Sequence, residues 1–267
     1  RSIVHPLPTT TEPAMKTVLI TGCSSGYGLE TARHFHAQGW NVVATMRSPH
    51  DGLLPRSDRM RVLPLDVTSP QSIAAALETS GPLDALVNNA GIGLAGAFEG
   101  TPMATVREIF DTNTFGTMAM TQAVLPQFRS QRAGVVVNVT SSTTLAPMPL
   151  VAAYTASKSA VEGFTASLAL ELEAFGIVVK LVVPGYGPST RFTSNGGRRM
   201  QGLIPEPYAP YAQHVFASYA QIGAVTTEAD VAEAVWRAAT DRTGQLRFPA
   251  GADAVALARA RQGALAA

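Results

Sequence analysis

The sequence predicts an α/β fold of three layers, in which helices cover both faces of a doubly wound, mostly parallel sheet. From Met15 onward, short and almost wholly apolar runs alternate with longer helical patterns. Runs without polar alternation are typical of strands that are buried on both faces, as in parallel sheets. Strand–helix–strand units with right-handed crossovers build such a sheet, and its ligands bind beyond the carboxyl ends of the strands.

The expected elements alternate along the whole chain. The strands are expected at Thr17–Thr21, Asn41–Met46, Arg61–Leu65, Ala85–Asn88, Val135–Thr140 and Ile177–Val183. The helices are expected at Gly28–Gln38, Pro70–Thr79, Pro102–Ser130, Ala152–Phe175 and Glu228–Thr240.

Length and composition are those of a globular domain. The chain has 267 residues, of which 46% are hydrophobic and 15% charged, so it is not of the disordered class. We expect one domain over residues 15–267. Residues 1–14 are rich in Pro and Thr and lack periodicity, so we expect them to be a leader or an arm added for expression.

The charge and cysteine content exclude several function classes. Lys+Arg 20 against Asp+Glu 19 gives a net charge of +1, which offers no field for nucleic acid or an anionic membrane. No run of 18 apolar residues is present to span a membrane. The single cysteine, Cys23, excludes an internal disulfide and a cysteine-based zinc site, and it fits a reducing, cytoplasmic setting. His34 and His36 lie on different faces of the first helix, so no metal site is expected.

A glycine-rich turn follows the first strand. It reads Thr21-Gly-Cys-Ser-Ser-Gly-Tyr-Gly28 and leads into a helix. Glycine lets the backbone approach a pyrophosphate, and the first helical turn offers free N–H groups. The position favours a Rossmann fold that binds a dinucleotide, although a tight turn without a ligand is the alternative. The residues expected to contact a cofactor are Gly22, Ser24, Ser25, Gly26, Tyr27 and Gly28.

The second strand bears on the choice between NAD and NADP. An acid about 20 residues after the glycines would bind the 2′-hydroxyl of NAD. The run Asn41–Ser48 contains no acid but carries Arg47, which can pair with a 2′-phosphate. This pattern favours NADP(H) over NAD(H), with an ordinary solvated arginine as the alternative.

Two polar side chains lie one helical turn apart in the fourth expected helix. Tyr154 and Lys158 share a helix face, although an exposed ridge would give the same spacing. Ser141 and Ser142 follow the strand Val135–Thr140, where a doubly wound sheet places its site. Asn113 lies inside the long helical pattern from Pro102, where it could also point to water.

Together these motifs resemble the short-chain dehydrogenase/reductase family, in its single-domain form, from about Met15 to Thr240. The matching residues are Thr21-Gly22-x-x-x-Gly26-x-Gly28, Asp66, Asn88-Asn89-Ala90-Gly91, Asn113, Ser141, Tyr154-x-x-x-Lys158 and Pro184-Gly185. Each motif is moderate evidence, but seven in this order with fitting spacing are strong evidence.

The resemblance implies roles for individual residues. Asn113, Ser141, Tyr154 and Lys158 would form the catalytic tetrad. Asp66 and Val67 would meet the adenine, Asn88, Ala90 and Gly91 would line the nucleotide channel, and Pro184 and Gly185 would lead to the nicotinamide. Lys158 would also hold the nicotinamide ribose. A homodimer or homotetramer is likewise a family expectation.

The chain departs from the family pattern at two places. Thr144 stands three residues after Ser141, where the family often has glycine. After Pro184 the chain continues Gly-Tyr-Gly-Pro-Ser189-Thr190, so the hydroxyl that caps the cofactor could come from Ser189 or Thr190.

The chemistry explains why a tyrosine and a lysine would stand together. Reduction of a ketone requires a proton donor, which we expect to be Tyr154, while Ser141 stabilises the charge on the substrate oxygen and Asn113 seats a water that passes protons toward Lys158. Lowering the pKa of a tyrosine from about 10 to about 7 requires roughly 4 kcal/mol. One cation about 5 Å away supplies roughly 3 kcal/mol in a sheltered cleft and under about 1 kcal/mol in water. We therefore expect Lys158 and an oxidised nicotinamide to acidify the phenol.

The expected function is an NADP(H)-dependent oxidoreductase that interconverts a ketone or aldehyde and its alcohol on an apolar small molecule. An apolar segment of about residues 189–222 and the loop after Ser141 would select that substrate. The alternatives are an NAD-dependent secondary-alcohol dehydrogenase and a redox-inert, nucleotide-sensing binding protein.

Overall fold

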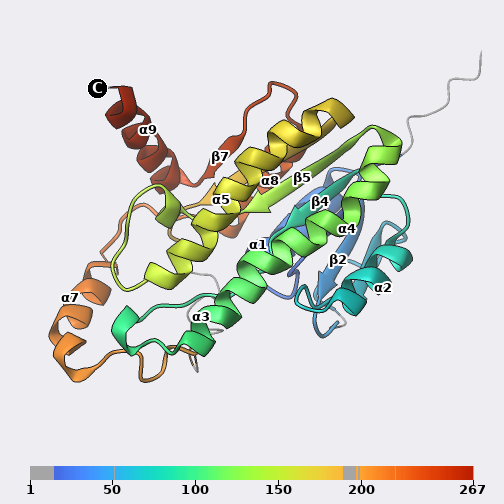
Figure 1. Cartoon of the computed structure of the whole chain (residues 1–267). Coiled ribbons are helices and arrows are strands. Elements are labelled where there is room, and N and C mark those ends of the chain that lie inside the picture. Colours follow the sequence, from blue (N-terminus) through green and yellow to red (C-terminus); the bar gives the residue numbers. More distant parts are fainter. Residues whose placement is uncertain (1–14, 51, 189–196, 198, 220, 267) are drawn as a thin grey trace, which may run out of the picture.

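A seven-stranded parallel sheet forms the centre of the computed structural model (Figure 1). The structure describes all residues except 1–14, 51, 189–196, 198, 220 and 267. The strand order is β3-β2-β1-β4-β5-β6-β7, and every pairing between these strands is parallel. The predicted fold class is therefore confirmed, with a sheet that is parallel throughout its described strands.

The elements alternate along the chain as the apolar pattern indicated. The strands are β1 (Thr17–Ile20), β2 (Asn41–Met46), β3 (Met60–Pro64), β4 (Ala85–Asn88), β5 (Gly134–Val139), β6 (Ile177–Pro184) and β7 (Arg247–Ala250). The α-helices are α1 (Gly26–Ala37), α2 (Pro70–Ser80), α3 (Met103–Phe110), α4 (Gly116–Gln131), α5 (Ala152–Leu172), α7 (Ala209–Tyr219), α8 (Glu228–Thr240) and α9 (Ala252–Ala266).

Alternate residues of each central strand enter two different hydrophobic cores. In β1, Val18 and Ile20 pack toward α1 and α8, whereas Leu19 packs toward α2, α4 and α5. All three side chains are fully buried. This burial on both faces explains why the strands are apolar throughout, and it produces the layered arrangement seen in Figure 1.

The long predicted helix Pro102–Ser130 is divided into three parts. Helix α3 passes into a π-helical turn, Asp111–Phe115, which continues directly into α4. The prediction of one regular helix was wrong here because an extra residue in a turn leaves the apolar pattern almost unchanged. Such π-helical turns occur frequently at functional sites.

Strand β7 and helices α7 and α9 were not predicted. Strand β7 has four residues, Arg-Phe-Pro-Ala, and its proline argued against a strand. It forms at the sheet edge beside β6, where proline is tolerated. Helix α7 begins at Ala209, directly after the 3₁₀ turn Glu206–Tyr208, in the proline-rich stretch Pro205–Pro210.

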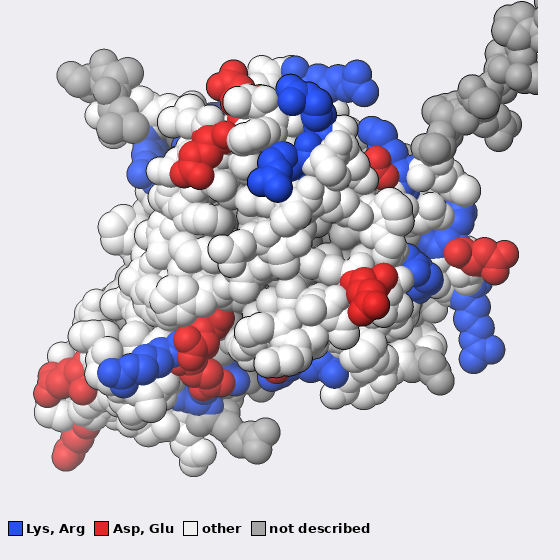
Figure 2. Space-filling view, turned by 45° about the vertical axis from the view of Figure 1, so that its right-hand side comes forward, with Lys and Arg blue, Asp and Glu red and all other residues white. Residues whose placement is uncertain are grey.

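Charged side chains of both signs are interspersed around a largely uncharged centre on the face seen in Figure 2. No single-sign field covers this face, in agreement with the balanced composition. Among the described residues, no helix is long and apolar enough to cross a membrane.

A buried ion pair joins β6 to the segment that precedes β7. The Lys180 side chain is only 2% exposed, and its ammonium lies 2.7 Å from Asp241 Oδ2 and 2.6 Å from the Gln245 carbonyl oxygen. This hydrogen bond lowers the pKa of Asp241. The pair fixes the chain just before it enters the edge strand.

Asp241→Ala should strongly destabilise the protein because it leaves the buried ammonium of Lys180 without its carboxylate. The expected loss in the free energy of unfolding is about 3–5 kcal/mol, measured by urea unfolding. Glu233→Ala is the matched control, since it breaks the exposed pair with Arg237 and should cost about 1 kcal/mol or less. Equal losses in the two variants would contradict the structural role of Lys180.

Candidate active site

The glycine turn after β1 adopts the close-packed shape that its glycines permit. Gly22 has a φ of +78° and Gly26 a φ of +54°, both in the left-handed region. A Cβ added at Gly28 would lie 2.3 Å from the Gly22 carbonyl oxygen, so only glycine fits there. Helix α1 starts at Gly26, and the Ser25 side chain makes no capping hydrogen bond. This turn is a cradle that brings the helix N-terminus up to a ligand.

The turns after β1 and β4 are bonded to each other where the strand order reverses. Thr21 Oγ1 accepts hydrogen bonds from the backbone N–H groups of Asn89 (3.0 Å) and Ala90 (2.9 Å). Asn89 Nδ2 donates in return to the carbonyl oxygens of Thr21 (2.9 Å) and Gly22 (3.2 Å). The glycine turn is thus held in place from the neighbouring strand.

Asn88 does not occupy the place that was predicted for it. Its side chain points into the sheet interior, where Nδ2 donates to Thr121 Oγ1 (3.0 Å) and Asn138 Oδ1 (2.9 Å). The residue of this pair that borders the neighbouring cavity is Asn89. The sequence prediction missed Asn89 because two consecutive asparagines do not reveal which of them still belongs to strand β4.

Arg47 and Asp66 stand at the ends of neighbouring strands. Both border the same cavity as the glycine turn after β1. Hydrogen bonds from the backbone and side chain of Thr68 lower the pKa of Asp66, and the positive charge of Arg47 acts in the same direction. The two side chains therefore lie close enough to interact, beyond the carboxyl ends of β2 and β3.

The predicted pair on α5 faces the end of β5. Lys158 is 5% exposed, and its Nζ donates a 3.0 Å hydrogen bond to the Val139 carbonyl oxygen. Tyr154 is partly buried, and its side chain is hydrogen-bonded to that of Ser141. The exposed Tyr/Lys ridge considered as an alternative is therefore excluded.

Asn113 is fully buried in the π-helical turn and does not point to water. Its side-chain amide pairs with the backbone of Ile92, at 2.8 Å from the Ile92 N–H and 3.0 Å to the carbonyl oxygen. The same amide donates to Ser157 Oγ at 3.2 Å, on the turn of α5 between Tyr154 and Lys158. The π-helical turn thus attaches helix α5 to the turn after β4.

Gly91 lies where Asn113 and Lys158 converge. A Cβ added at Gly91 would be 3.2 Å from Asn113 Oδ1 and 3.4 Å from Lys158 Nζ. The four residues of the predicted tetrad, which come from the segment after β5, from α5 and from the π-helical turn, are therefore brought together.

The loop after β6 is fixed by an acid that the sequence did not reveal. The Asp253 carboxylate accepts hydrogen bonds from the Tyr186 backbone N–H (2.6 Å) and from Thr226 Oγ1 (2.7 Å). A Cβ at Gly185 would collide with this carboxylate at 2.1 Å. Ser189 and Thr190, the two candidates for the capping hydroxyl, lie outside the described residues.

A cavity of about 860 Å³ is bordered both by the glycine turn after β1 and by the Tyr154–Lys158 pair on α5. Of the predicted residues, it is bordered by Gly22, Ser24, Ser25, Gly26, Tyr27, Gly28, Arg47, Asp66, Val67, Ala90, Gly91, Tyr154 and Lys158. Asn88, Pro184 and Gly185 are not among its described lining residues, and Ser141 adjoins it through Tyr154. Its size and glycine cradle fit an extended dinucleotide.

Burial dominates the electrostatics of the pair on α5. It raises the pKa of Tyr154 to about 12, while the hydrogen bond with Ser141 acts in the opposite direction. It lowers the pKa of Lys158 to about 8. The expected acidification of Tyr154 is therefore not a property of the protein alone, because the cost of removing the phenolate from water outweighs the attraction of a nearby cation.

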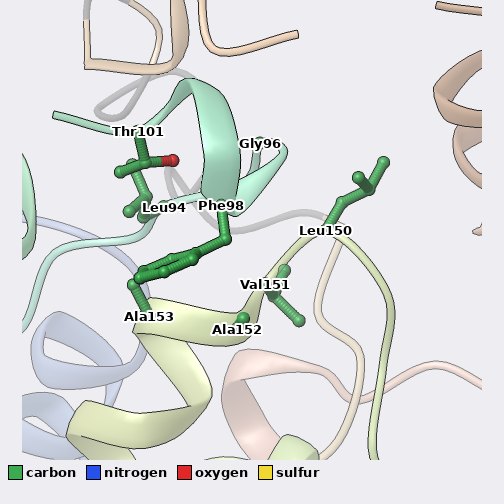
Figure 3. A pocket seen from close by; sticks show the side chains of 8 residues that line it. All are labelled: Leu94, Gly96, Phe98, Thr101, Leu150, Val151, Ala152 and Ala153. Atoms are coloured by element: carbon green, nitrogen blue, oxygen red, sulfur yellow. The ribbon is translucent and has the colours of Figure 1, made fainter. Parts of the chain in front are cut away.

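An apolar recess lies beside the start of α5. It is lined by Leu94, Gly96, Phe98, Thr101, Leu150, Val151, Ala152 and Ala153. Figure 3 shows Phe98 extending toward Ala153, the residue just before Tyr154. Leu203 packs in the same apolar cluster as Leu94 and Ala153, so part of the predicted substrate segment is fixed to the core. His214 is exposed.

The described residues contain no group of three or more His, Cys, Asp or Glu side chains that could hold a metal ion. Cys23 is fully buried, and burial raises the pKa of its thiol to about 12.

Comparison with known proteins identifies the family. The family model for short chain dehydrogenases matches residues 16–199, more than half of the chain. The chain belongs to the short-chain dehydrogenase/reductase family. Members are oxidoreductases that act on alcohol and carbonyl groups with nicotinamide cofactors, and the resemblance drawn from the motifs is thereby confirmed.

Three curated relatives illustrate the match. Retinol dehydrogenase 8 of Bos taurus is 44% identical over 184 residues, which cover 64% of this chain and only 59% of the relative. The uncharacterized oxidoreductase YusZ of Bacillus subtilis is 34% identical over 250 residues, covering 88% of this chain and 89% of that protein. The 3-ketodihydrosphingosine reductase of Bacteroides thetaiotaomicron is 41% identical over 185 residues, covering 67% of this chain and 66% of that protein.

Solved structures share the fold. A short-chain dehydrogenase from Streptomyces avermitilis matches with a TM-score of 0.79 and 32% identity, over 96% of this chain and 94% of that chain. A 3-ketoacyl-(acyl-carrier-protein) reductase from Brucella melitensis, complexed with NADH, has a TM-score of 0.72 and 26% identity over 88% and 96%. A serine dehydrogenase complexed with NADP+ has a TM-score of 0.73 and 27% identity over 88% and 94%. Similar folds therefore hold either cofactor.

The buried Lys158 should make stability depend on pH. Between about pH 8 and about pH 10 the folded state has lost this proton while the unfolded state, with a lysine pKa near 10.4, retains it, so the free energy of unfolding rises with pH. Relative to Lys158→Met, the wild type should gain up to about 1.4 kcal/mol per pH unit in this window, measured by urea unfolding.

The control for this measurement is Lys16→Met, which removes an exposed lysine and should not reproduce the effect. A pH-independent difference between the wild type and Lys158→Met would contradict the burial of the ammonium.

Proposed function

We propose that the protein is an NADP(H)-dependent oxidoreductase that reduces a ketone or aldehyde on an apolar small molecule, or oxidises the corresponding alcohol. The observation that carries this proposal is the convergence of Ser141, Tyr154 and Lys158 beside a cavity that the glycine cradle also lines. Nicotinamide, when bound, donates or accepts the hydride.

Tyr154 is the proposed general acid in reduction and general base in oxidation. With its pKa raised to about 12, the phenol stays protonated at neutral pH and can donate to the carbonyl oxygen. Ser141, bonded to the same phenol, stabilises the negative charge that develops on that oxygen. The oxidation direction needs additional positive charge in the cleft, to which Lys158 contributes while it is protonated.

Lys158 and Asn113 have supporting roles. Lys158 is anchored at Val139, which leaves two ammonium protons to hold the ribose hydroxyls. The Asn113 side-chain amide already forms hydrogen bonds with the Ile92 backbone and Ser157 Oγ. The water that Asn113 was predicted to bind would therefore be held by the backbone of the π-helical turn.

The preference for NADP over NAD rests on Arg47. No acid occupies the end of β2, where NAD-binding members would engage the ribose hydroxyls. Arg47 borders the cavity there and can form charge-assisted hydrogen bonds with a 2′-phosphate. A dehydrogenase with the same tetrad and NAD is the alternative.

The proposed substrate is apolar and fairly bulky. Leu94, Phe98, Leu150 and Val151 line a recess beside Ala153 that is too small to hold a water molecule, so they mark an apolar surface next to Tyr154 and not a formed binding pocket. The names of two relatives, a retinol dehydrogenase and a 3-ketodihydrosphingosine reductase, point in the same direction. A homodimer or homotetramer stays a prediction of the family resemblance.

The deciding experiment is a screen of carbonyl compounds and alcohols with each cofactor, followed by the absorbance of the reduced nicotinamide. The panel contains all-trans-retinaldehyde, 3-ketodihydrosphingosine and smaller polar ketones. Faster turnover of the apolar compounds with NADPH is expected. Cofactor binding without turnover of any compound would instead favour the redox-inert binding protein.

Tyr154→Phe should remove the proton donor while leaving the cavity nearly unchanged. We expect kcat to fall at least about 100-fold, because general acid–base catalysis contributes about 10²–10⁴-fold. NADPH affinity, measured by fluorescence titration, should stay within about twofold, well below the effect of one hydrogen bond to a charged group. Unchanged turnover would refute the role of Tyr154.

Arg47→Ala should weaken NADPH binding about 10–100-fold, since a hydrogen bond to a charged group contributes about 1.5–3 kcal/mol. NADH binding should change much less because it has no 2′-phosphate. Arg56→Ala, which removes an exposed arginine from the following loop, is the matched control. Equal losses for NADPH and NADH would contradict phosphate recognition.

A further inference from the structure

Helix α5 carries a third buried polar side chain on the face that bears the catalytic pair. Glu162 follows Lys158 by four residues, as Lys158 follows Tyr154, so the three side chains form one ridge. Glu162 is 7% exposed, and a carboxylate at such a position requires hydrogen-bond partners. The proposed reaction gives this residue no task.

The partners of Glu162 lie on both sides of Ser141 in the sequence. Oε1 accepts a 2.5 Å hydrogen bond from Thr144 Oγ1 and lies 3.4 Å from Thr140 Oγ1. Oε2 lies 3.4 Å from an Arg247 guanidinium nitrogen on β7. The carboxylate is thus attached to the residue before Ser141 and to the residue three after it.

Thr144 connects this carboxylate directly to the serine. Its hydroxyl lies 2.5 Å from Glu162 Oε1 and 2.7 Å from the Ser141 carbonyl oxygen, so its single proton is shared between two acceptors. The Thr144 backbone N–H donates to the same carbonyl at 3.0 Å. A glycine, which the family often has at this position, would provide no such hydroxyl.

We propose that Glu162, acting through Thr144, is a positioning residue for Ser141 in the carbonyl reaction. Ser141 lies two residues beyond β5 and leads into a single 3₁₀ turn, Ser142–Thr144, whose internal hydrogen bonds do not fix its place against α5. The ridge of α5 supplies that fixation at both ends, through Tyr154 at Ser141 itself and through Glu162 at Thr144. Because a displacement of about 1 Å in a catalytic group can cost about 100-fold in rate, this attachment bears on kcat.

The same loop provides a matched control. Thr143 is buried, and its hydroxyl finds no hydrogen-bond partner among the described residues. Thr143→Val and Thr144→Val make the same chemical change at adjacent positions. Only the second removes a link between Ser141 and α5.

The inference rests on the proposed function and is tested with four variants, Thr144→Val, Thr144→Ser, Glu162→Gln and Thr143→Val. The carbonyl probe is all-trans-retinaldehyde with NADPH or, if wild type does not reduce it, the panel compound that wild type reduces fastest. Thr144→Val should lower kcat about 10–100-fold with NADPH affinity unchanged within about twofold. Thr144→Ser should restore most of the wild-type kcat. The kcat of Glu162→Gln should lie between those of Thr144→Val and wild type, and the kcat of Thr143→Val should equal that of wild type.

Hydrogen exchange of the backbone amides of residues 143–145 provides a readout that needs no turnover. These amides should exchange about 5–10-fold faster in Thr144→Val than in wild type, the effect of one lost hydrogen bond, and not in Thr143→Val. If the panel contains no substrate, the proposed function fails, while this measurement still decides whether Thr144 fixes the loop.

Equal kcat values, or equal exchange rates where no compound is reduced, in Thr144→Val and Thr143→Val would overturn the inference. A parallel loss of kcat, NADPH affinity and thermal stability in Thr144→Val and Glu162→Gln would also overturn it. That pattern would assign the carboxylate to general folding, whereas a loss confined to kcat and rescued by serine supports positioning.

Discussion

The attachment of helix α5 to the carboxyl end of β5 is the constraint on which the site depends. Lys158 reaches the last carbonyl of the strand, and Tyr154 reaches the serine just beyond it. Both contacts require one helix face to stay directed at one strand end, because a rotation of α5 by a single residue would turn both side chains away by about 100°. The π-helical turn opposes this rotation through Asn113 and Ser157.

The burial of Tyr154 and Lys158 also changes their pKa values. Removal from water favours the neutral forms of both side chains, which raises the pKa of Tyr154 and lowers that of Lys158. The protein therefore prepares a phenol that retains its proton, as the reduction of a carbonyl compound requires. In the proposed function, oxidation of an alcohol would need additional positive charge near the phenol, which an oxidised nicotinamide would supply when bound.

The sequence predicted the parallel sheet because its strands are buried on both faces, and it predicted the tetrad because the motifs have characteristic spacings. It predicted six of the strands to within one or two residues. It did not predict β7 or the π-helical turn, since a proline-containing edge strand and one extra residue in a helix leave little trace in apolar periodicity. It also assigned Asn88 to the nucleotide channel, whereas in the structure Asn88 is the last residue of β4 with its side chain in the interior, and the next residue, Asn89, borders the cavity.

What the chain determined by itself was local: where strands end, where glycines permit a tight turn, and which side chains share a helix face. Those properties follow from the backbone and from patterns a few residues long. Only the tertiary structure decided which partners meet, such as Glu162 with Thr144, Asp253 with Tyr186, and Arg47 with Asp66. It also decided the direction in which Tyr154 titrates, because desolvation depends on everything packed around a group and no sequence spacing encodes it.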